Sequence, residues 1–156
     1  MEHVSICAEE KSKQVHIVAE ILNPQKVKLA DFAGVLGDGS VEIVSSQYME
    51  QNLLAQVAVT PGVAEVYRDL LTFEKETSEI YGMKIPSKFT GKSFKEVLKF
   101  VLELRDKNIN MIPIAISRRG KVYVNPSDSH VNAIEDGDTL FVICDSEDDL
   151  KKVAGC

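Results

Sequence analysis

The chain has 156 residues, of which 44% are hydrophobic and 27% charged, and its formal net charge is −6. This composition is typical of a soluble globular protein with a buried core, and it excludes a disordered tail, a collagen-like fibre and a disulfide-stapled miniprotein. The acidic balance argues against a nucleic-acid partner, because nucleic-acid-binding modules normally carry a basic face. No apolar run approaches the roughly 20 residues of a membrane span, and the first residues do not resemble a secretory signal. The three cysteines, Cys7, Cys144 and Cys156, lack metal-binding spacing, so we expect reduced thiols.

The first third of the chain predicts alternating helices and strands. Residues 1–13 predict the end of a helix, and the β-branched run at 15–21 predicts a buried strand. Asn23 and Pro24 suit the N-cap and first position of a helix that runs to about residue 33. A Gly- and Asp-rich loop and a second strand at 41–44 follow. This order is typical of a parallel α/β sheet.

Two further helices close the first lobe. Apolar positions at helical spacing predict one helix over 47–59 and another over 63–71. Thr60 is expected to be the N-cap of the second helix. The composition becomes polar after Phe73, so we place a linker at 74–79.

The second lobe predicts an α+β fold over residues 80–156. A strand at 78–85 precedes Ser93 and Glu96, which fit a capping box at the start of a helix to about Lys107. Two strands around Arg118-Arg119-Gly120 read as a hairpin, and Asp136-Gly137-Asp138 reads as a turn. The two hairpin strands are expected at 111–117 and 121–124. A further strand is expected at 139–144, and the last helix at 146–153.

The sequence holds none of the motifs of a serine hydrolase, a zinc protease or a P-loop. The three histidines are far apart. Gly34, Gly37 and Gly39 precede a strand instead of following one, so they predict a turn and not a dinucleotide site. No catalytic turnover is expected.

The order of the segments resembles the RCK (regulator of K+ conductance) family. The matching segments are 15–22, 23–34, 41–45 and 52–71 for the second half of the RCK, or TrkA-N, domain, and 112–118, 120–121, 125–126 and 134–143 for TrkA-C. The resemblance implies a partial Rossmann-like parallel sheet with crossover helices at 1–73, followed by a small TrkA-C-like ligand-binding lobe. It also implies a cytoplasmic, ligand-sensing domain, tethered to the membrane through a transport subunit. Such a domain gates a potassium channel or transporter through rearrangement of a homodimer or higher ring.

The strand, glycine-rich turn and helix that open a complete RCK domain are not in this sequence. We therefore expect an N-terminally truncated domain that does not build the usual NAD or ATP site by itself. The ligand is left open between an anionic nucleotide and a divalent cation. Glu20 matches the first carboxylate of a cation site found in some family members, but Leu22 stands where a second acid would be. The alternative for Glu20 is a strand-end carboxylate that pairs locally.

In related TrkA-C domains a small ligand, in some a cyclic dinucleotide, binds near a segment that matches 112–118 here. Arg118 matches the arginine of that segment, and the neighbouring Arg119 and Lys121 add positive charge. Asn125, just after the next strand, and His130, near the same edge, complete the predicted ligand site. Arginine suits a phosphate because its planar fork donates two parallel hydrogen bonds. The alternative is that these are solvated residues of a hairpin.

The crossover helices are the expected dimer interface. Their apolar positions are Leu53, Leu54, Val57, Val63, Val66, Tyr67 and Leu70. The same spacing would also suit ordinary core helices. Competing functions are a pure oligomerisation module without a small ligand, the regulatory lobe of a cation/proton antiporter, and a fragment of a nucleotide-dependent oxidoreductase. The missing glycine-rich turn disfavours the last of these.

Overall fold

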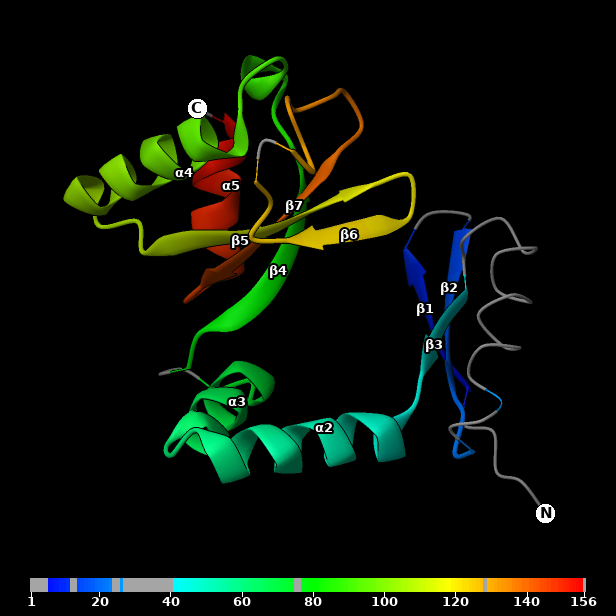
Figure 1. Ribbon diagram of the computed structural model, residues 1–156. Coiled ribbons are helices and arrows are strands. Elements are labelled where there is room, and N and C mark those ends of the chain that lie inside the picture. Colours follow the sequence, from blue (N-terminus) through cyan, green and yellow to red (C-terminus); the bar gives the residue numbers. More distant parts are fainter. Residues whose placement is uncertain are drawn as a thin grey trace. The chain divides into compact units, whose positions relative to one another are not determined.

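The structure is a computed structural model that describes residues 6–11, 14–23, 26, 41–74, 77–127 and 129–155 (Figure 1). The chain divides into two compact units, Met1–Ala64 and Glu65–Cys156, so the predicted linker lies inside the second unit. Apart from Lys26, the predicted helix over 24–33 and the loop over 35–40 lie outside the described residues. No helix in the described ranges is both long and apolar enough to cross a membrane.

The first unit contains a three-stranded sheet in the order β1-β2-β3, formed by Ile6–Lys11, Gln14–Glu20 and Val41–Val44. The pair β2–β3 is parallel, which confirms the two predicted strands and the α/β class. The predicted helix end was wrong over 6–11. This segment instead pairs antiparallel with β2, from Ile6 opposite Ala19 to Lys11 opposite Gln14. The partner strand supplies its backbone hydrogen bonds, which local sequence does not reveal.

Two helices follow, α2 at Ser46–Val59 and α3 at Val63–Leu71, and both were predicted. Thr60 caps the C-terminus of α2, where its N–H donates to the Gln56 carbonyl at 2.9 Å. It is therefore not the N-cap of α3. Every residue of these two helices is described, and none of them is buried.

The second unit is an antiparallel sheet in the order β4-β7-β5-β6. Its strands are Glu79–Lys84, Met111–Arg118, Lys121–Val124 and Thr139–Cys144 for β4 to β7. Its helices are α4 at Phe94–Glu103 and α5 at Glu147–Gly155, with the 3-10 turns η2 at Ser87–Phe89 and η3 at Leu104–Lys107. This arrangement confirms the predicted α+β lobe, although its first helix changes to a 3-10 turn at Leu104.

The core of the second unit lies between one face of the sheet and the two helices. Strand β7 alternates, with Leu140, Val142 and Cys144 buried and the residues between them partly exposed. They pack in one cluster with Val97 and Val101 of α4. Such alternation is typical of a sheet that is covered on one face only.

The hairpin between β5 and β6 has a two-residue turn. Arg119 and Gly120 have φ values of 51° and 79°. Positive φ at both central positions defines the type I′ turn, whose twist matches that of the flanking strands. The predicted hairpin is confirmed.

The capping box of α4 forms as predicted. The Glu96 N–H donates to the Ser93 hydroxyl, and the Ser93 N–H donates to the Glu96 carboxylate at 2.8 Å. These hydrogen bonds, first from the backbone and then from the side chain of Ser93, lower the pKa of Glu96.

Ser93→Ala is expected to lower the free energy of unfolding of the second unit by about 1 kcal/mol, because it leaves an N-terminal N–H of α4 without its acceptor. Urea unfolding measures this change. The matched control is Ser87→Ala, since Ser87 is exposed and the 3-10 turn it begins has no side-chain cap. Equal losses in the two variants would contradict the prediction.

Candidate functional site

Arg118 lies at the end of β5 and is held inside its own unit. Its Nε and one terminal nitrogen donate to the two carboxylate oxygens of Asp138 at 2.9 and 2.7 Å. The guanidinium also donates to the Ala133 carbonyl at 2.6 Å and pairs with Glu135 at 2.8 Å. The side chain of Arg118 is 19% exposed and that of Asp138 only 2%. The fork predicted to receive a phosphate therefore binds an internal carboxylate.

This ion pair shifts the pKa values of both Arg118 and Asp138. The hydrogen bond to Asp138 is the largest effect on Arg118 and raises its pKa. Burial alone would raise the pKa of Asp138, but the hydrogen bonds from Arg118 and from the Glu135 N–H outweigh it and lower that pKa. Both groups stay charged, and the pair is a fixed part of the fold.

The neighbouring cations are open to solvent. Arg119 is 86% exposed and contacts the same Glu135 carboxylate at 3.4 Å, so Arg118 and Arg119 meet on one acidic side chain. The Lys121 ammonium lies 4.9 Å from the centre of the Tyr123 ring. Arg119 and Lys121 are the predicted site cations that an anionic ligand could reach.

Asn125 and His130 lie further along the chain. The Asn125 N–H donates to the Ile114 carbonyl at 2.7 Å, with its backbone in the left-handed region at φ 44°. His130 Nδ1 lies 3.1 Å from the Ser127 hydroxyl. In the described part of the chain neither side chain contacts Arg118, so a site made of all five residues stays a prediction.

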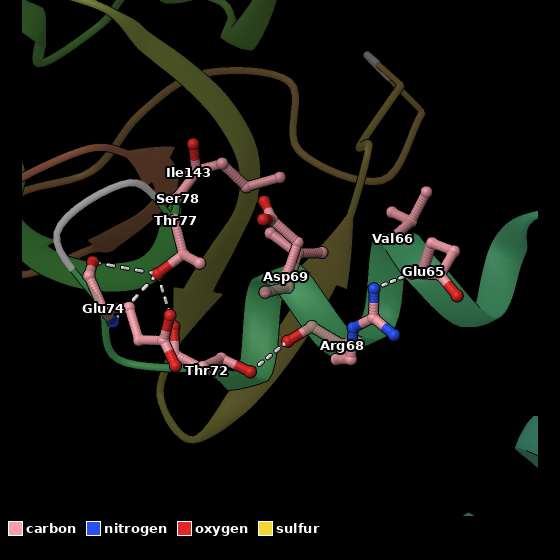
Figure 2. Close-up of a pocket in the computed structure, with 10 residues that line it drawn as sticks. Glu65, Val66, Arg68, Asp69, Thr72, Glu74, Thr77, Ser78 and Ile143 are labelled. Atoms are coloured by element: carbon pink, nitrogen blue, oxygen red, sulfur yellow. Dashed lines mark hydrogen bonds and ion pairs between the residues drawn. The ribbon is translucent and has the colours of Figure 1, made fainter.

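A pocket of about 720 Å³ in the second unit was not predicted (Figure 2). It is lined by α3, by the connection from α3 to β4, and by Ile143 of β7. Its charged residues are Glu65, Arg68, Asp69 and Glu74, and Arg68 is paired with Glu65. The sequence signal for it is the 3–4 spacing of polar residues along α3, a pattern that solvated helix faces share.

Thr77 fixes the connection beside this pocket (Figure 2). Its hydroxyl lies within hydrogen-bond distance of the Thr72 carbonyl at 2.6 Å and accepts from the Glu74 N–H at 3.0 Å. Ser78 donates to Asp145, which begins the segment after β7, at 2.7 Å. The Thr77 hydroxyl thus holds the connection to the end of α3, and the Ser78 hydroxyl holds it to the segment that follows β7.

Glu20, at the end of β2, accepts a hydrogen bond from the Ser46 hydroxyl at 2.5 Å. Among the described residues no group of three or more His, Cys, Asp or Glu side chains could hold a metal ion. The local contact is the one expected of a strand-end carboxylate. A calcium ligand at Glu20 stays a prediction.

Cys144 is buried at 1% exposure on β7. Burial raises its pKa to about 11. The thiol is therefore protonated at neutral pH and a poor nucleophile. It belongs to the core.

The predicted interface residues of α2, and those of α3, are exposed or partly exposed. Leu54 is 61% exposed and Val66 is 56% exposed. The other five, Leu53, Val57, Val63, Tyr67 and Leu70, are partly exposed. Apolar side chains of this size that remain open indicate a surface for a partner.

Residues 47–155 match the model of a protein family described as "Castor and Pollux, part of voltage-gated ion channel". The chain belongs to this family. Among its Castor and Pollux relatives, the ion channel POLLUX of Lotus japonicus is 30% identical over 133 residues, which is 85% of this chain and 13% of the relative. The ion channel CASTOR of the same species is 32% identical over 133 residues, 85% of this chain and 14% of that protein. The chain thus spans about one seventh of these Castor and Pollux channels.

The human SLO3 gating ring has a similar fold, with a TM-score of 0.70 and 19% identity over 87% of this chain and 27% of that one. This likeness confirms the predicted fold class. The Castor and Pollux match places the chain in a family that forms part of ion channels.

Proposed function

We propose that this chain is a regulatory segment of a Castor- and Pollux-type ion channel, located on the cytoplasmic side and attached to the pore-forming part. It controls potassium flux when a ligand changes the arrangement of a dimer or ring of such segments. The observation that carries the proposal is the family match over residues 47–155. The gating-ring fold supports it. No catalytic turnover is part of this function.

The exposed apolar side chains of α2, and those of α3, support assembly. With no buried residue in either helix, their apolar side chains are left for a partner to cover. A second copy of the chain supplies a matching surface, since closed homo-oligomers are the commonest assemblies.

The ligand of the proposed sensor is an anion held by Arg119 and Lys121. Arg118 does not contact it, because its guanidinium is already bound to Asp138. Arg118 instead fixes the end of β5 from which the hairpin turn extends. A ligand regulates the assembly only if it binds one arrangement more tightly than the other.

Thermal unfolding of the full chain tests the sensor with ADP, ATP, NADH, a cyclic dinucleotide and Ca²⁺ in turn. A ligand at one hundred times its dissociation constant should stabilise the fold by about 2.7 kcal/mol and raise the midpoint. The double variant Arg119→Ala/Lys121→Ala should lose the shift given by an anion. The control Lys95→Ala, on the exposed side of α4, should keep it. No shift with any of the five compounds would contradict the sensor.

The internal pairing of Arg118 favours a second candidate, a module that assembles channel subunits and binds no small ligand. Light scattering separates the two. Assembly without any ligand effect supports this second candidate. The corresponding part of a cation/proton antiporter would behave in the same way in these assays, and ion-flux measurements on the whole transport protein distinguish it.

A further inference from the structure

Positive charge is concentrated around α4 in the second unit. Residues 84–107 contain seven Lys and Arg and three Asp and Glu, so their net charge is +4, whereas that of the whole chain is −6. Four of these cations are exposed and lie in η2, in α4 or between the two: Lys88, Lys92, Lys95 and Lys99. We call this set the lysine surface.

None of the four ammonium groups pairs with a carboxylate in the described part of the chain. Lys88 Nζ donates to the Val153 carbonyl at 3.4 Å and lies 4.8 Å from the centre of the Phe100 ring. Lys92 Nζ lies 5.6 Å from the centre of the Phe89 ring. An aromatic ring attracts an ammonium group without neutralising its charge. The lysine surface therefore keeps its positive charge.

The nearby acidic side chains do not cancel this charge. Glu96 accepts two hydrogen bonds from Ser93, which direct its carboxylate to the N-terminus of α4. The acidic first turn of α5 begins at Glu147, roughly 9 Å along that helix from Val153, whose carbonyl accepts Lys88. The Debye length is about 8 Å at physiological salt, so charges further away are largely screened. The local positive charge thus decides what this surface attracts.

Two leucines share a helix face with two of the lysines. Lys95, Leu98, Lys99 and Leu102 are spaced i, i+3, i+4 and i+7, which is one face of α4, and the buried residues of the helix lie at other positions. Leu102 is 42% exposed, and Leu98 is partly exposed. Helix α4 lies at the edge of the second unit (Figure 1). Lysines beside exposed leucines are typical of a helix that lies on the surface of a bilayer.

We propose that the lysine surface binds the surface of an anionic bilayer. The ammonium groups contact the phosphate and carboxylate groups of the lipid headgroups, and Leu98 and Leu102 contact the boundary of the acyl chains. A convex helix face fits an extended surface because it has no walls to enclose a small anion. Lysine binds a phosphate as a point charge, so it accepts many headgroups without a fixed geometry.

This contact goes beyond the proposed function and does not depend on it. A regulatory segment attached to a pore is already held near the membrane. The lysine surface adds a second contact, whose strength depends on the lipid composition. The proposed anion ligand is held by Arg119 and Lys121, which do not belong to this surface.

Co-sedimentation of the full chain with vesicles tests the proposal. The probes are vesicles of phosphatidylcholine alone and vesicles of phosphatidylcholine mixed with phosphatidylserine. We expect binding to the mixed vesicles only, and sodium chloride should weaken it because salt screens the attraction. The double variant Lys95→Gln/Lys99→Gln should lower the affinity about 25-fold, since each lysine beside an anionic surface contributes about fivefold.

The matched control is Lys151→Gln/Lys152→Gln, which removes the same charge from α5. Lys151 lies 3.4 Å from Asp148 and Lys152 lies 2.7 Å from Asp149, so both ammonium groups are already paired. This variant should change the affinity by less than about twofold. All four substitutions are at exposed positions, and thermal unfolding checks that both double variants are folded.

Equal binding to the two kinds of vesicle would overturn the proposal, as would equal losses in the two double variants. Displacement by sodium phosphate, at an ionic strength where sodium chloride leaves the chain bound, would show a discrete anion site in place of the bilayer contact. Absence of binding to both kinds of vesicle would also overturn it, and would point to an acidic protein segment as the partner. These outcomes are independent of the thermal shift that tests the proposed sensor.

Discussion

Arg118→Ala should lower the free energy of unfolding of the second unit by about 3–5 kcal/mol, because it leaves the buried carboxylate of Asp138 without its partner. Denaturant unfolding measures this loss. The control is Arg119→Ala, the neighbouring arginine, which contacts Glu135 from an 86% exposed position and should change stability by no more than about 0.5 kcal/mol. Similar values for the two variants would show that the Asp138 pair is not a fixed part of the fold.

The same pair gives stability a defined pH dependence. Because the pKa of Asp138 is lower in the folded chain, the stability from its ionised form is fully present above about pH 4, the ordinary value for aspartate. This stability is lost as the pH falls through the depressed folded-state pKa. Asp138→Asn should remove that part of the acid dependence. An unchanged pH profile in Asp138→Asn would contradict the assignment.

Phe89→Ala should cost about 3–5 kcal/mol, since the side chain is 1% exposed and its removal leaves a cavity. The ring packs edge-on against Phe100 with centroids 5.0 Å apart, and the Lys88 ammonium lies 5.2 Å from its centre. Urea unfolding followed by circular dichroism measures the loss.

The matched control is Phe73→Ala, the same substitution at a position that is 80% exposed. It should change the free energy of unfolding by no more than about 0.5 kcal/mol. A large loss at Phe73 would show that a partner covers this residue in solution, whereas a small loss at Phe89 would contradict the packing of the core.

Elements whose conformation depends on residues close in the sequence were predictable. The capping box at Ser93 and Glu96 and the Arg119-Gly120 turn follow from local hydrogen bonding and backbone preference, and both form. The strand at Ile6–Lys11 was missed because its conformation depends on pairing with β2. An acidic segment between apolar residues fits a helix equally well until that partner is known.

In the candidate site, too, local features were predictable and contacts between distant residues were not. The sequence identifies the cationic hairpin, but it does not reveal that Asp138, twenty positions from Arg118, neutralises the arginine of the predicted ligand site. Asp138 was recognised only as a turn residue. The pocket beside α3 was missed because its lining comes from a helix, a connection and Ile143, which the fold brings together.

Asp138 also joins three segments that are distant in the sequence. Its carbonyl accepts the Ile85 N–H directly after β4 at 3.0 Å, and its carboxylate binds Arg118 at the end of β5. The same carboxylate accepts the Glu135 N–H at 2.9 Å. A displacement that enters through β4 therefore moves the hairpin and the 133–138 segment with it. We therefore expect the second unit to transmit motion as a stiff body instead of absorbing it by local bending.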